Sequence, residues 1–74
     1  MINNPNSPKY TISSAAALLG ISVHTLRMYE REGLIIPFKK ESGQRLYSDR
    51  DIERIQCINY YFVLFIVSYF SISF

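Results

Sequence analysis

Two short helical segments lie very close together in the sequence, and their spacing constrains the fold more than any other feature. Residues 12–19 place apolar side chains at helical spacing around an alanine-rich centre, and Thr11 can cap their N-terminus. Gly20 can end this first helix by adopting the left-handed backbone conformation. Ser22 can then cap a second helix after a break of about three residues. Two helices joined this tightly must cross at a large angle, which predicts a helix-turn-helix.

The second helix, expected over residues 23–32, has two unlike faces when successive residues are placed about 100° apart. Val23 and Leu26 lie on its apolar face. The opposite face carries His24, Arg27, Met28 and Arg31. Arg27 and Arg31 are like charges one helical turn apart, which costs the helix roughly a few tenths of a kcal/mol. An anionic partner would remove that cost. The polar face is therefore a candidate binding surface, with an ordinary solvated face as the alternative.

A small hairpin is expected after the second helix. Residues 34–36 are apolar and rich in β-branched side chains, which predicts a strand. After the polar stretch over residues 38–44, residues 45–47 alternate polar and apolar side chains as a second strand would. The hairpin would form a wing whose tip carries Lys39 and Lys40.

A third helix is expected to start after Ser48, whose hydroxyl can cap it, with Asp49 and Asp51 favourably placed in the first turn. Its buried stripe would contain Ile52, Ile55 and either Ile58 or Asn59. The order of helix, tight turn, helix, hairpin and third helix predicts a mainly α, winged helix-turn-helix domain over residues 10–58, followed by an apolar C-terminal tail. Residues 1–9 are expected to form a disordered leader.

Three separate blocks of this domain resemble the DNA-binding domain of MerR-type transcriptional regulators. The blocks are YTIS at residues 10–13, GISVHTLRMYEREGL at residues 20–34 and GQRLYS at residues 43–48, followed by Asp51 and Ile52. They occur in the order and spacing of the family. The resemblance implies double-stranded DNA as the partner and sequence-specific regulation of transcription as the function.

The same resemblance implies roles for particular side chains. In this family the second helix enters the major groove, which implies DNA contacts from Ser22, His24, Thr25 and Arg27. Tyr29 matches a tyrosine that helps to hold the DNA backbone. The wing residues Arg45 and Tyr47 match phosphate contacts, and Lys39 would add salt-dependent affinity. Met28 departs from the family, which usually has an aromatic residue there.

Several of these residues have a structural alternative. Tyr29 and Tyr47 could be core aromatics, and Glu30 is expected to cap or pair locally because DNA would repel it. The net charge of +2 is too small by itself to indicate nucleic acid. The single Cys57 cannot supply the several thiolates of a structural zinc site. With only one histidine and no paired nucleophile and base, the sequence predicts neither enzyme activity nor a cofactor. The N-terminus lacks a secretion signal, which favours a cytoplasmic protein.

The end of the chain differs from the rest in composition. All fourteen charged side chains lie between Lys9 and Arg54, whereas residues 57–74 contain none and hold seven of the eleven aromatic residues. MerR-type regulators continue toward a long amphipathic helix that pairs two subunits. Apolar residues occupy every helical phase over residues 60–67, so the sequence has no separate apolar stripe through which two such helices could pair. The chain is therefore expected to lack the dimerisation and effector regions, and to bind a DNA half-site weakly as a monomer.

Three explanations remain open for residues 59–74, which we call the apolar tail. The uncharged run over residues 56–74 is near the lower length limit for a membrane-spanning helix, although its aromatic and β-branched residues suit a helix poorly. The tail could instead be a buried strand or helix that completes the core. A shifted reading frame or truncation is the third explanation. A membrane-tethered or protein-interaction module is accordingly the alternative function.

Overall fold

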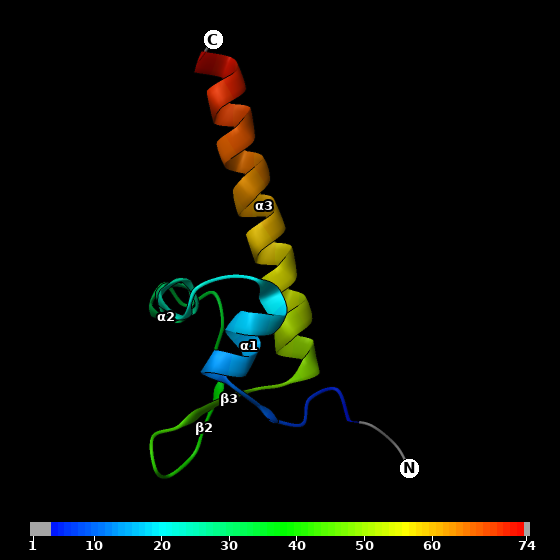
Figure 1. The fold of residues 1–74 in the computed structure, drawn as a ribbon, viewed down its shortest axis with the longest axis vertical. Helices are drawn as coiled ribbons and strands as arrows, with labels where there is room; N and C mark the ends of the chain where they lie inside the picture. Colours follow the sequence, from blue (N-terminus) through cyan, green and yellow to red (C-terminus); the bar gives the residue numbers. More distant parts are fainter. Residues whose placement is uncertain (1–3, 74) are drawn as a thin grey trace.

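A computed structural model describes residues 4–73 of the chain as a small helical domain with one helix extending from it (Figure 1). The elements in chain order are β1 (Tyr10–Thr11), α1 (Ile12–Leu19), α2 (Val23–Arg31), β2 (Phe38–Lys39), β3 (Arg45–Tyr47) and α3 (Asp49–Ser73). α1 and α2 lie beside the first part of α3, and the remainder of α3 projects away from them (Figure 1). This is the predicted winged helix-turn-helix.

The turn between α1 and α2 is built by the predicted capping residues. The side chain of Thr11 accepts a hydrogen bond from the backbone N–H of Ser14 at 3.2 Å. The side chain of Ser22 accepts one from the N–H of Thr25 at 3.1 Å. Gly20 ends α1 with a φ of 67°, a left-handed conformation that side-chain-bearing residues rarely adopt. Local signals therefore place both helices within a residue of the predicted bounds.

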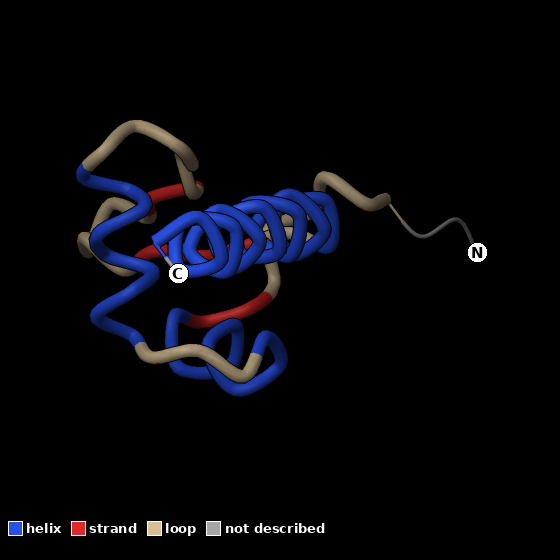
Figure 2. The backbone as a smooth tube through the Cα atoms, turned by 90° about the horizontal axis from the view of Figure 1, so that it is seen from above, coloured by secondary structure: helices blue, strands red, loops and turns tan. Residues whose placement is uncertain are grey.

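The small sheet has the strand order β1-β3-β2, and both pairs are antiparallel. Its short strands are the red segments of the tube in Figure 2. Tyr10 lies opposite Tyr47, and Lys39 lies opposite Arg45. The first pair joins the wing to the segment that leads into α1. The sheet thus ties the wing to the helix-turn-helix.

The prediction of a strand over residues 34–36 is wrong, because the wing pairs through Phe38–Lys39 instead. Ile35 is buried and belongs to the core, whereas Ile36 is 88% exposed. The β-branched residues here connect α2 to the wing and supply one core side chain. Packing therefore accounts for Ile35 alone, since Ile36 neither pairs in the sheet nor packs in the core.

The core lies where α1, α2 and the first half of α3 meet the sheet. Its buried members are Ala15, Ala16, Leu26, Tyr29, Ile35, Tyr47 and Ile55. The alanines of α1 are small enough for the larger side chains of the neighbouring elements to pack against them. Leu26 and Ile55 are fully buried, and each contributes roughly 1.5–3 kcal/mol. The apolar stripes predicted for the three helices are confirmed.

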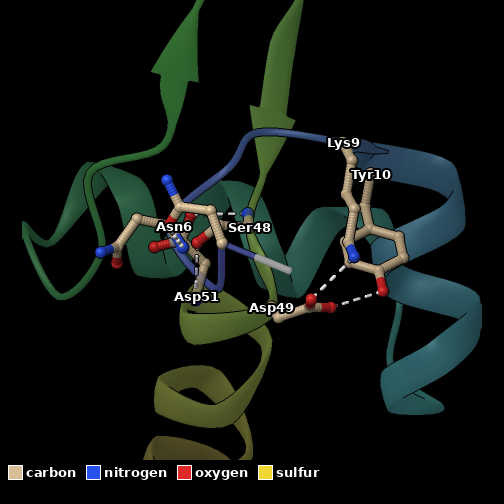
Figure 3. A network of polar contacts seen from close by, with 7 residues as sticks. Asn6, Lys9, Tyr10, Ser48, Asp49 and Asp51 are labelled. Atoms are coloured by element: carbon tan, nitrogen blue, oxygen red, sulfur yellow. Dashed lines mark hydrogen bonds and ion pairs between the residues drawn. The ribbon is translucent and has the colours of Figure 1, made fainter. Parts of the chain in front are cut away.

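A reciprocal pair of hydrogen bonds fixes the start of α3 (Figure 3). The Ser48 hydroxyl accepts from the N–H of Asp51 at 3.1 Å, and the Asp51 carboxylate accepts from the N–H of Ser48 at 3.0 Å. The neighbouring Asp49 carboxylate accepts from the Lys9 ammonium at 2.7 Å and from the Tyr10 hydroxyl at 2.6 Å. These two donors hold the pKa of Asp49 below its usual value.

Residues 4–9 contact the domain rather than standing clear of it, which differs from the disordered leader expected over residues 1–9. The N–H of Arg50 donates to the carbonyl of Pro5 at 3.0 Å, and the N–H of Lys9 donates to the carbonyl of Tyr47 at 3.0 Å. The first bond satisfies a helix N-terminal donor, a long-range role that the leader's composition does not reveal. The expectation for residues 1–3 lies outside the described residues.

α3 continues without a break past residue 58, where the predicted domain ends and the apolar tail begins. The large apolar side chains from Tyr60 to Phe70 are 39–69% exposed. The tail is therefore neither the buried strand nor the buried helix that was one expectation. A capped and packed helix start favours this continuation, since each further residue adds a hydrogen bond. Among the described residues, no helix combines the length and hydropathy needed to cross a membrane.

Candidate nucleic-acid interface

The solvent-facing side of α2 carries the polar face that the sequence predicts. His24, Arg27 and Arg31 are exposed, whereas Met28 is half-buried and packs against the core. Arg27 makes no ion pair or hydrogen bond with any residue in the described part of the chain. Its guanidinium is thus free to bind an acceptor outside the protein, and Arg side chains can bind phosphate or guanine at two points.

Ser22 and Thr25 form a hydroxyl pair at the start of α2. Their side-chain oxygens lie 2.9 Å apart, and Ser22 also accepts from the backbone of Thr25. The two hydroxyls carry two protons, and their mutual hydrogen bond uses one. The other proton can be donated to a base edge or a phosphate oxygen.

Arg45 lies on the wing, and its guanidinium binds Glu30 of α2. The Nε atom of Arg45 is 2.6 Å from both carboxylate oxygens of Glu30. This hydrogen bonding raises the pKa of Arg45 further above its usual value. Glu30 forms an ion pair, but its partner lies 15 residues away on the wing and not locally as predicted. The pair gives Arg45 a structural role in holding the wing against α2. Lys39 lies opposite Arg45 in the sheet and is exposed.

Tyr29 and Tyr47, which the resemblance assigns to DNA contact, are instead buried in the core. They are 1% and 0% exposed, respectively. The hydroxyl of Tyr29 donates to the side-chain oxygen of Asn59 on α3 at 3.2 Å, whereas the hydroxyl of Tyr47 has no partner among the described residues. Burial raises the pKa of both phenols. With almost no accessible surface, neither ring can touch a ligand in this conformation.

A polar groove of about 430 Å³ separates the start of α1 from the wing. Its lining includes Ser13 of α1, Arg27 of α2, and Gln44 and Arg45 of the wing. The groove brings together two predicted contact residues, Arg27 and Arg45, that lie far apart in the sequence. Sequence reasoning did not identify Ser13 or Gln44, because their proximity to Arg27 arises only from the folded chain.

Comparison with known proteins links this arrangement to one family. The family described as MerR HTH family regulatory protein matches residues 10–62. The HTH-type transcriptional activator TipA of Streptomyces coelicolor is 38% identical over 53 residues, which cover 70% of this chain and 21% of TipA. The uncharacterized HTH-type transcriptional regulator YyaN of Bacillus subtilis is 51% identical over 45 residues, which cover 60% of this chain and 33% of YyaN.

A solved structure shows the same relationship. It is the crystal structure of HiNmlR, a MerR family regulator lacking the sensor domain, bound to promoter DNA. The two structures superpose with a TM-score of 0.64 at 37% sequence identity. The match covers 68% of this chain and 39% of the HiNmlR chain. The similarity thus concerns the helix-turn-helix and wing, and the chain spans only 21% and 33% of the lengths of TipA and YyaN.

Proposed function

The chain belongs to the MerR helix-turn-helix family of regulatory proteins, and from this premise we propose that it binds double-stranded DNA and regulates transcription. The observation that carries the proposal is the exposed face of α2 with His24 and Arg27, of which Arg27 lies beside the wing that carries Lys39. This face is rich in donors, and an α-helix fits the major groove. The protein acts by binding rather than by catalysis, and we place it in the cytoplasm.

Different residues of this surface suit different parts of DNA. His24 projects from α2 and is suited to a base edge. Arg27 lies at the border between α2 and the wing, and its guanidinium is suited to a backbone phosphate. The hydroxyl pair of Ser22 and Thr25 at the start of α2 suits a backbone phosphate. Lys39 on the wing would add affinity that does not depend on sequence. We assign Tyr29, which is buried, to packing α2 against the core.

One domain presents one α2 helix and therefore contacts one half-site. A single half-site contact lacks the gain in affinity that two linked contacts provide. At concentrations where the 74-residue chain is monomeric, we expect it to bind duplex DNA weakly. The binding should depend strongly on salt, because phosphate contacts release bound counterions.

Fluorescence anisotropy with short duplexes tests the proposal. Replacing Arg27 by Ala should weaken binding about tenfold or more, since it removes a charged contact from α2. Arg54→Ala is the matched control, because it removes the same charge from an exposed position on α3 that lies outside α2 and the wing. Equal binding by wild type and Arg27→Ala, together with an affinity that does not change with salt, would contradict the proposal.

A further inference from the structure

Three hydrogen-bond donors line the groove between α1 and the wing without an acceptor from the protein. They are the hydroxyl of Ser13, the side-chain amide of Gln44 and the guanidinium of Arg27. Within residues 4–73, none of these side chains forms a hydrogen bond or an ion pair. Each comes from a different element, and together they offer an external acceptor several donors at once.

The charge in the groove is also unbalanced. No acidic residue is part of its described lining, and the positive charge of Arg27 is uncompensated. Arg45 also lines the groove, but Glu30 already pairs with its Nε atom at 2.6 Å. The groove therefore keeps an excess positive charge, which favours a negatively charged ligand.

The wing leaves space for a ligand to approach closely. Gly43 lines the groove with a φ of 93°, and a Cβ added to it would meet nothing within 4 Å. The turn needs glycine for its backbone conformation, and the missing side chain leaves this wall of the groove open. The adjacent Gln44 is itself exposed, so an external ligand can reach its side-chain amide.

An oxyanion that accepts several hydrogen bonds matches these donors and this charge. We propose that the groove binds a phosphate group of the DNA backbone, with Ser13 and Gln44 as contacts in addition to Arg27. This inference rests on the proposed function. Such a contact would hold one DNA strand between α1 and the wing, and would position α2 in the major groove without reading sequence.

Placing a negative charge in the groove tests the assignment. Ser13→Asp should weaken duplex binding at least about tenfold, because the carboxylate would face the phosphate. An acidic residue in the first turn of α1 is favourable to the helix, so the fold should be retained. Gln44→Ala removes only a neutral donor, and the expected loss is about threefold to tenfold. Gln56→Glu adds the same negative charge at an exposed position on α3, outside the groove and the apolar tail, and should leave binding unchanged.

The losses of duplex affinity caused by Ser13→Asp and Gln44→Ala should be equal on duplexes of different sequence, because the backbone phosphates are the same in all of them. If wild type binds duplex and Ser13→Asp binds like Gln56→Glu, the groove assignment is overturned while the proposed function stands. If wild type binds no duplex, both are overturned. A loss confined to one sequence would indicate a base contact and would also overturn the phosphate assignment.

Inorganic phosphate distinguishes the source of the anion. In an NMR titration, the DNA assignment predicts that duplex shifts the amide signals of Ser13 and Gln44 at concentrations where inorganic phosphate does not. Shifts with inorganic phosphate and none with duplex would identify a site for free phosphate and would overturn the DNA assignment.

Discussion

The buried hydroxyl of Tyr47 is the residue-scale feature with the clearest energetic consequence. Its ring is fully buried between the wing and the helices, yet its oxygen has no hydrogen-bond partner within the described residues. Leaving a buried hydroxyl unpaired costs about 1–3 kcal/mol. Tyr29 is buried to the same degree, but its hydroxyl is paired with Asn59 at 3.2 Å. The two tyrosines therefore offer a matched comparison.

Replacing each tyrosine by phenylalanine should change stability in opposite directions. Tyr47→Phe keeps the packed ring and removes the unpaired hydroxyl, so the free energy of unfolding should rise by about 1 kcal/mol. Tyr29→Phe loses a hydrogen bond and should lower it by about 1 kcal/mol. Urea unfolding followed by circular dichroism measures both. Weaker DNA binding by a stable Tyr47→Phe variant would show instead that this hydroxyl reaches DNA.

At the scale of elements, the Arg45–Glu30 pair joins the wing to α2. Both side chains are partly exposed, at 38% and 25%, so solvent screening keeps the contribution of the pair to stability small. Its main effect is geometric, because Tyr47 and the pairing of β1 with β3 already anchor the wing in the domain, and the salt bridge adds a link to α2. The salt bridge sets how far the wing stands from the exposed face of α2.

Glu30→Gln should loosen the wing without unfolding the domain. We expect faster amide hydrogen exchange over residues 38–47 and only a small loss of unfolding free energy, because the pair is partly exposed. Glu32→Gln is the control, since Glu32 is an exposed acid at the end of the same helix. Unchanged exchange in the wing of Glu30→Gln would argue that the sheet alone holds it in place.

The sequence predicts elements well where local signals decide them. Thr11, Gly20 and Ser22 determine the bounds of α1 and α2 through hydrogen bonds and backbone conformation within a few residues. The position of β2 could not be predicted in this way, because pairing with β3 decides it. The groove is hidden for the same reason: Ser13 and Gln44 become neighbours only after the sheet joins β1 to the wing.

Burial of Tyr29 and Tyr47 was left open by the sequence, since an aromatic hydroxyl suits both a core and a DNA backbone. Tyr29 sits at the border of the apolar and polar faces of α2, where periodicity does not decide. Only the packing of α3 and the wing against α2 removes both rings from solvent.

At the scale of the whole molecule, charge and apolar surface are segregated along α3. The first part of this helix packs in the domain, and the apolar tail projects from it into solvent (Figure 1). Ten large apolar side chains of the tail are 39–69% exposed, which amounts to on the order of 1,000 Å² of apolar surface. Monomeric proteins rarely expose patches of that size. The tail should therefore drive self-association.

A chain ending at Asn59 should remain folded and become monomeric. Asn59 and Ile58 are kept because the first accepts from Tyr29 and the second packs against the core. The full chain should sediment as larger species as its concentration rises, since the exposed surface is comparable to the roughly 800 Å² per partner of a standard interface. The shortened chain should show one monomeric species with the same thermal midpoint. Monomeric sedimentation of the full chain at high concentration would contradict the prediction.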